Sequence, residues 1–141
     1  MAMEYRDGRL DEIVDKFMRP AIADTGFDLR RLDDDPRAGL IDDRLRVEIR
    51  AARFILADLT HRNPGAYWEA GYAEGLGKPV IYTCEKCAFD EKASHFDTNH
   101  HLHVLWEYDK LTDFVRRLKA TVRASIPEAK GEDGQNEEGE R

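Results

Sequence analysis

Apolar residues near the start of the chain recur with the period of an α-helix. They lie at Leu10, Ile13, Val14, Phe17, Met18, Ala21 and Ile22. Pro20 lies late in this stripe. Because a proline inside a helix costs roughly 3 kcal/mol, we expect a kink or a new helix start there. Thr25 and Gly26 are predicted to end the helix.

Four short apolar runs predict β-strands. They cover residues 27–32, 54–57, 79–83 and 103–106. The first alternates with a period of two, and the second is a continuous apolar run typical of a strand buried on both faces. Helical patterns cover residues 40–52, 63–76 and 109–126. Asn63 followed by Pro64 is a strong helix start, because asparagine caps a helix and proline suits its first turn.

Strands separated by helices of this length predict parallel βαβ units. We therefore expect an α/β fold, a flavodoxin-like (Rossmann-like) three-layer sandwich with a parallel sheet. The first strand of that fold lies in the middle of the sheet, and only residues 1–3 remain to form it. The flanking strands could pair directly, another subunit could supply a strand, or the true start could lie upstream of Met1. We favour the upstream start, which means that this chain lacks part of its sheet and of its site.

Composition and charge define one domain, residues 1–126, and an acidic tail, residues 127–141, that is predicted to be disordered. The net charge is −7, of which the tail carries −4. The remaining body is only mildly acidic, which argues against non-specific binding to nucleic acid. No apolar run has the length of a membrane span or a signal peptide, so we expect a cytoplasmic protein with no membrane partner.

The most informative segment follows the strand at 54–57. Asp58 ends that strand, and ligands of open α/β sheets bind at the carboxyl ends of strands. The amide groups after Asn63 form a natural anion site, next to Gly65. Glu69 is a lone carboxylate in an otherwise apolar helix. Alternatively, Asp58 only caps the loop, Asn63 only caps the helix and Glu69 is a solvated side chain.

This segment resembles nucleoside 2-deoxyribosyltransferase-like domains and the related TIR-like nucleotide-binding domains. The matching residues are Ala57-Asp58-Leu59-Thr60, Asn63-Pro64, Glu69-Ala70-Gly71-Tyr72-Ala73 and Gly77-Lys78-Pro79-Val80. Residues 33–39 resemble the loop before the second helix of such proteins, with Asp35 and Gly39 as candidate ligand-binding residues.

The resemblance implies chemistry at an N-glycosidic bond. Glu69 would attack the anomeric carbon or stabilise an oxocarbenium-like sugar. Asp58 would orient the sugar or Glu69, and the loop from Thr60 to Gly65 would hold phosphate or ribose hydroxyls. We expect a nucleoside or nucleotide ligand, with NAD as a candidate substrate rather than a cofactor, and a possible homo-oligomer. The rival hypothesis is a non-catalytic nucleotide sensor or a TIR-like assembly domain.

Two cysteines, Cys84 and Cys87, precede a group of histidines. Two thiolates and two imidazoles can form a tetrahedral zinc site. Those histidines are His95, His100, His101 and His103. The spacing is not that of a common zinc finger, so we favour free thiols beside the ligand cleft and predict no metal site.

Overall fold

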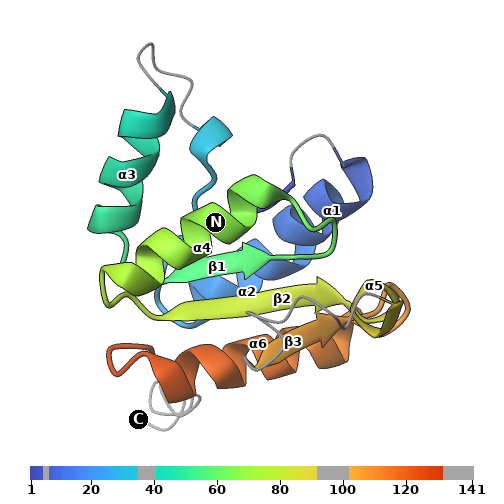
Figure 1. The fold of residues 1–141 in the computed structure, drawn as a ribbon. Helices are drawn as coiled ribbons and strands as arrows, with labels where there is room; N and C mark the ends of the chain where they lie inside the picture. Colours follow the sequence, from blue (N-terminus) through green and yellow to red (C-terminus); the bar gives the residue numbers. More distant parts are fainter. Residues whose placement is uncertain (5–6, 35–40, 92–101, 132–141) are drawn as a thin grey trace, which may run out of the picture.

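A computed structural model describes residues 1–4, 7–34, 41–91 and 102–131 of the chain. Three strands form an open sheet in the order β1-β2-β3, and all of them run parallel (Figure 1). The strands are β1 (Ile55–Asp58), β2 (Val80–Glu85) and β3 (His103–Trp106). Asp58 pairs in register with Thr83, which places the carboxyl ends of β1 and β2 side by side.

Helices cover both faces of the sheet, as Figure 1 shows. One face carries α1 (Gly8–Ile13), η1 (Val14–Met18), α2 (Arg19–Asp24) and α6 (Leu111–Ser125). The other carries α3 (Ile41–Ala51) and α4 (Pro64–Gly75). Two short helices, η2 (Leu32–Asp34) and α5 (Lys86–Glu91), complete the set. The predicted α/β fold with a parallel sheet is therefore confirmed. In the described residues no helix is long and apolar enough to cross a membrane.

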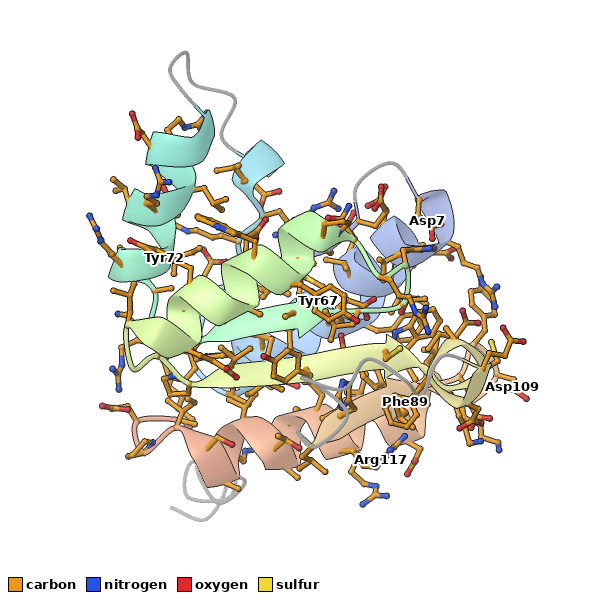
Figure 2. The ribbon with its side chains drawn as sticks, in the orientation of Figure 1. Asp7, Tyr67, Tyr72, Phe89, Asp109 and Arg117 are labelled. Carbon is orange, nitrogen blue, oxygen red and sulfur yellow. The ribbon has the colours of Figure 1, made fainter. Side chains whose placement is uncertain are left out.

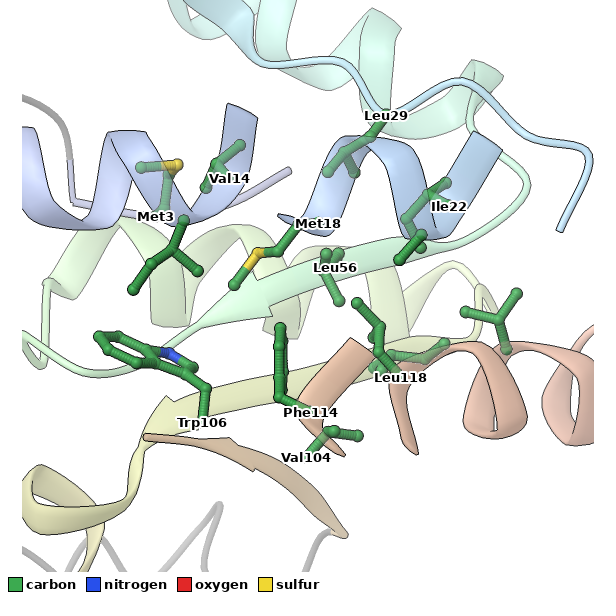
Figure 3. Close-up of a cluster of buried hydrophobic side chains, with 14 of the residues drawn as sticks. Met3, Val14, Met18, Ile22, Leu29, Leu56, Val104, Trp106, Phe114 and Leu118 are labelled. Carbon is green, nitrogen blue, oxygen red and sulfur yellow. The ribbon is translucent and has the colours of Figure 1, made fainter. Parts of the chain in front are cut away.

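The larger hydrophobic core lies between the sheet and the helical layer of α1, η1, α2 and α6 (Figure 3). Leu56 and Val104 project from the strands toward Phe114 and Leu118 of α6. Phe114 is completely buried, and truncating such a side chain to alanine typically costs about 3–5 kcal/mol. Packing against this helical layer therefore stabilises the sheet that carries the candidate site.

Pro20 lies within a helical stretch that continues through it. A π-helical turn, Val14–Met18, comes directly before it, with the Arg19 amide bonded to the Val14 carbonyl. A new α-helical segment then begins at Arg19, so that Pro20 falls in its first turn, where a missing N–H group costs little. The helix ends at Asp24, and the turn after it passes through Gly26, whose φ of 91° is readily adopted by glycine.

The stub at residues 1–3 pairs with β1. The Ala2 amide donates to the Leu56 carbonyl at 2.9 Å, and the Asp58 amide donates to the Ala2 carbonyl at 2.9 Å. This isolated parallel bridge joins Ala2 to Ala57 and places residues 1–3 beside β1, on the side away from β2.

The predicted strand at residues 27–32 is wrong, because the structure has no strand there and η2 begins at Leu32. The ammonium group of Met1 donates to the Arg30 carbonyl at 2.6 Å, which is where the stub meets this segment. A strand requires a neighbour along its length, and the stub is too short to supply one.

The folded part of the chain extends beyond the predicted boundary at Ile126. The Lys130 amide donates to the Thr25 carbonyl at 2.9 Å, and Arg123 Nε donates to the Lys130 carbonyl at 2.8 Å. Ala129 packs against the core. The prediction of a disordered tail therefore needs correction for residues 127–131. Hydrogen bonds to the backbone of Lys130 hold this segment, although it has no large apolar side chain. Residues 132–141 lie outside the described residues.

Candidate functional site

Asp58 lies at the end of β1 and is almost completely buried. Its carboxylate accepts hydrogen bonds from the Thr60 amide at 3.0 Å, the Thr83 hydroxyl at 2.7 Å and Trp106 Nε1 at 3.0 Å. Burial raises the pKa of Asp58, and these three donors oppose that rise. The side chain therefore ties together the ends of β1, β2 and β3. The bond from Thr60 is the loop-capping contact considered from the sequence.

Thr60 is also buried and turned toward the protein. Its hydroxyl accepts a hydrogen bond from the Glu85 amide at 2.9 Å, which joins the loop after β1 to the end of β2. The turn tightens at Arg62, whose φ of 52° is unusual for a residue other than glycine. The loop therefore leaves the sheet in a fixed direction toward α4.

Asn63 caps α4, as the Asn-Pro pair indicates. Its Oδ1 atom accepts from the Ala66 amide at 3.2 Å, and its Nδ2 atom donates to the Glu4 carboxylate. A Cβ atom at Gly65 would lie 2.9 Å from Asn63 Oδ1, so the cap requires glycine there. An anionic side chain of the chain itself thus lies beside the amino end of α4, where the helix dipole favours negative charge.

Contacts with the start of α1 also hold this loop. His61 Nε2 lies 2.5 Å from an oxygen of Asp7, which in turn caps α1 through the Arg9 and Leu10 amides. Figure 2 shows Asp7 at this end of the molecule, above the carboxyl edge of the sheet. The predicted loop residues therefore lie together, and they are held by contacts with Glu4, Asp7 and Glu85.

Glu69 lies in the middle of α4 and is partly buried. It lines a cavity of about 300 Å³ together with Met1, Leu32 and other residues. Burial raises the pKa of Glu69 to about 7, although the nearby ammonium group of Met1 lowers it somewhat. In the described part of the chain its carboxylate has no hydrogen bond or ion pair, which sets it apart from Asp58.

A second, more polar cavity of about 350 Å³ shares several wall residues with the first. Its arginines are Arg19, Arg30, Arg31 and Arg44, and its acids are Asp28, Asp34 and Glu48. Arg19 holds Asp34 through two bonds of 2.8 and 3.0 Å and lowers the pKa of that carboxyl. None of these residues was predicted from the sequence as a site residue, although Asp34 lies next to the predicted Asp35. Asp35 and Gly39 themselves lie outside the described residues.

The sequence also missed two partners of Asp58, namely Thr83 and Trp106. Both lie near the carboxyl ends of their strands, and the register Asp58–Thr83 follows from aligning two parallel strands by their ends. That alignment could have identified Thr83 from the sequence. The bond from Trp106, two strands away, could not have been identified in this way.

Cys84 is buried in β2, and Cys87 is exposed on α5. The Glu85 carboxylate beside Cys87 raises the pKa of its thiol. His103 packs between the rings of Tyr82 and Phe89, with centroid distances of 5.4 and 5.0 Å. Across the described ranges no three His, Cys, Asp or Glu side chains are grouped as metal ligands. The other three candidate histidines lie outside those ranges.

Comparisons with protein-family models, curated proteins and solved structures found no match for this chain. The resemblance to nucleoside 2-deoxyribosyltransferase-like and TIR-like domains therefore rests on the motif residues alone.

Proposed function

We propose that this domain binds a nucleoside or nucleotide and cleaves or transfers at its N-glycosidic bond, with Glu69 as the reacting carboxylate. The observation that carries this proposal is the position of Glu69 in a cavity wall with no protein partner among the described residues. Glu69 is partly buried, and a carboxyl group that lines a cavity and has a raised pKa is a candidate for binding or chemistry.

The pKa of Glu69 suits a carboxyl group that acts either as an anion at the sugar or as a general acid. With a pKa of about 7, roughly half of the carboxyl groups are ionised at neutral pH. The ionised form can stabilise or capture the positive charge that develops at the sugar as the bond to the base breaks. The protonated form can act as a general acid.

The surroundings of Glu69 fit the two parts of a nucleotide. The wall of the first cavity is largely apolar, with Ile49, Phe54 and Leu56 suited to the face of a base or sugar. Its volume of about 300 Å³ is at the lower end of the range for ligand pockets. The adjoining cavity has four arginines and three acids, and a phosphate there would replace Asp28 and Asp34 as partners of Arg30 and Arg19.

The test is release of free base from NAD and from a panel of nucleosides and nucleotides, followed by chromatography. The wild-type protein should release base from at least one compound, and Glu69→Gln should lower that rate about 100-fold or more. The matched control is Glu74→Gln on the same helix, because Glu74 bonds to the Tyr82 hydroxyl outside the cavity and should retain the activity. Equal background rates in wild type and Glu69→Gln would contradict the proposal.

A second candidate function is ligand binding without turnover. Its support is that Asp58, Thr60 and Asn63 all use side-chain atoms in internal hydrogen bonds, which leaves Glu69 as the one predicted carboxylate facing a cavity in the described chain. A ligand at 100 times its dissociation constant should then stabilise the fold by about 2.7 kcal/mol, with no product formed.

A homo-oligomer belongs to the same proposal. It is supported by the exposed Val47 and Trp68 side chains, and sedimentation would test it.

A further inference from the structure

The side chain of Lys78 joins the ends of the two helices, α3 and α4, that line the first cavity. Its ammonium group donates to the Arg50 carbonyl at 2.8 Å and to the Ala52 carbonyl at 2.7 Å. These carbonyls lie at the carboxyl end of α3, where backbone carbonyls lack partners within the helix and the helix dipole favours a positive charge. Lys78 therefore caps α3 from a different part of the chain.

The backbone of Lys78 is fixed at the end of α4. Its amide donates to the Ala73 carbonyl at 2.9 Å, and Gly77 before it has a φ of 74°. This bond and this conformation are those of the Schellman motif, which commonly ends a helix. The carbonyl of the next residue, Pro79, accepts a hydrogen bond from the Ile55 amide at 2.9 Å. Lys78 thus reaches α3 from a position that α4 and β1 both hold.

The rest of α3 has few buried side chains. Among the residues of α3 whose side chains the structure describes, only Ile49 is buried, and Val47 is 62% exposed. The guanidinium carbon of Arg46 lies 5.6 Å from the ring centroid of Trp68 on α4. In Figure 1 the carboxyl end of α3 lies close to the start of β1, and its other end is farther from the sheet. The contacts at the carboxyl end are therefore the ones that set the position of α3.

The carboxyl half of α3 also forms part of the wall of the first cavity. Its residues in this wall are Leu45, Glu48, Ile49, Ala51 and Ala52. Since Lys78 bonds to the Ala52 carbonyl, it holds a wall residue directly. A shift of this end of α3 would move the wall relative to Glu69 on α4 and would change the shape of the cavity.

We propose that Lys78 is a positioning residue that fixes the carboxyl end of α3 against α4 and so sets the shape of the cavity around the ligand. The ligand in this statement rests on the proposed function, whereas the position of α3 does not. Lys78 is not among the described residues that line either cavity, so it acts through α3. A cavity wall contacts the ligand equally before and during the reaction, and its loss should weaken binding more than it slows the chemical step.

The experiment compares wild type with two variants of Lys78. Lys78→Met keeps a long side chain without the ammonium group, and Lys78→Arg restores a donor to both carbonyls. Hydrogen exchange of the amides in the last turn of α3 should be about tenfold faster in Lys78→Met than in wild type. Acrylamide should also quench Trp68 more strongly once Arg46 no longer covers its ring, and Trp106, the only other tryptophan, is buried and contributes little. Lys78→Arg should resemble wild type in both measurements, which need no ligand.

The third measurement is base release from the compound that wild type accepts, at a temperature where circular dichroism shows every variant folded. Lys78→Met should raise KM about tenfold and leave kcat within about threefold of wild type, and Lys78→Arg should restore KM. The matched control is Lys119→Met. Lys119 joins α6 to Asp24 of α2 through an ion pair of 3.2 Å, away from α3, so its loss should leave all three measurements unchanged.

The positioning role would be overturned if α3 exchange and Trp68 quenching in Lys78→Met matched wild type. It would also be overturned if α3 loosened while KM stayed the same. A wild-type protein that releases no base from any compound would count against the proposed function instead. The two measurements without ligand would then still decide whether Lys78 fixes α3.

Discussion

The contact between Thr83 and Asp58 gives the sharpest prediction about how the loop after β1 is held. Thr83 is fully buried, and its hydroxyl donates to Asp58 Oδ2 at 2.7 Å. Thr83→Val keeps the shape of the side chain and removes this donor, leaving the Trp106 indole as the other donor to that oxygen. A hydrogen bond to a charged group contributes about 1.5–3 kcal/mol, so the variant should unfold about 5–15 °C below wild type at a pH where Asp58 is ionised.

The pH dependence of this loss follows from the pKa of Asp58. The Thr83 hydroxyl lowers that pKa, because it stabilises the ionised carboxylate in the folded state. The contribution of Thr83 is therefore present where folded Asp58 is ionised and is lost as the pH falls through the folded pKa. The destabilisation of Thr83→Val should accordingly shrink at low pH.

Thermal unfolding followed by circular dichroism measures this effect, with Thr121→Val as the matched control. The Thr121 hydroxyl bonds to the Arg117 carbonyl within its own helix, so its loss should cost less than about 0.5 kcal/mol. The reasoning would be refuted if both variants lost the same stability, or if the cost of Thr83→Val were the same at every pH at which the protein stays folded.

Three further predictions concern the cap of α4, the tail and Glu69. Gly65→Ala should destabilise the fold by about 1 kcal/mol in urea titrations, because the new Cβ atom would displace the Asn63 cap. Gly71→Ala should instead stabilise the fold by about 0.5–1 kcal/mol, because there is open space around Gly71. Truncation after residue 126 should lower the melting temperature by roughly 3–8 °C through loss of the Lys130 contacts, and truncation after residue 131 should not. The folded pKa of Glu69 is raised to about 7, so its protonated form stabilises the folded state. This stabilisation is complete below the unfolded pKa of about 4.5 and is lost as the pH rises toward 7. Glu69→Gln should therefore flatten the curve of unfolding free energy against pH in that window.

Local sequence signals predicted most of the fold. The run His103–Trp106 was predicted with its observed bounds, and the Asn63-Pro64 pair located the start of α4. These features depend on neighbouring residues, and so periodicity and capping rules reveal them. The segment 27–32 shows the limit of such rules. It has the alternation of a strand, but a strand also needs a partner that the sequence of the segment does not contain.

In the candidate site, too, local sequence signals found the residues but not their long-range contacts. The sequence identified Asp58 because it ends a strand, Asn63 because it begins a helix, and Glu69 because it is a lone carboxylate in an otherwise apolar helix. It could not show that Trp106, two strands away, donates a hydrogen bond to Asp58. Nor could it show that Glu69 faces a cavity. It also missed the docking of residues 127–131, because the partners are distant in the sequence: Lys130 bonds to Thr25, and Glu128 bonds to Arg53.

The central claim is that Glu69 is the carboxyl group that faces the ligand. The most direct measurement is an NMR titration of the side-chain carboxyl carbons of glutamate, assigned with Glu69→Gln, in the absence and presence of saturating NAD or nucleoside. One glutamate carboxyl should titrate near pH 7, be missing in the variant and change its pKa when ligand is added. A Glu69 carboxyl that titrates near its ordinary value of about 4.5, unchanged by every ligand of the panel, would contradict the claim.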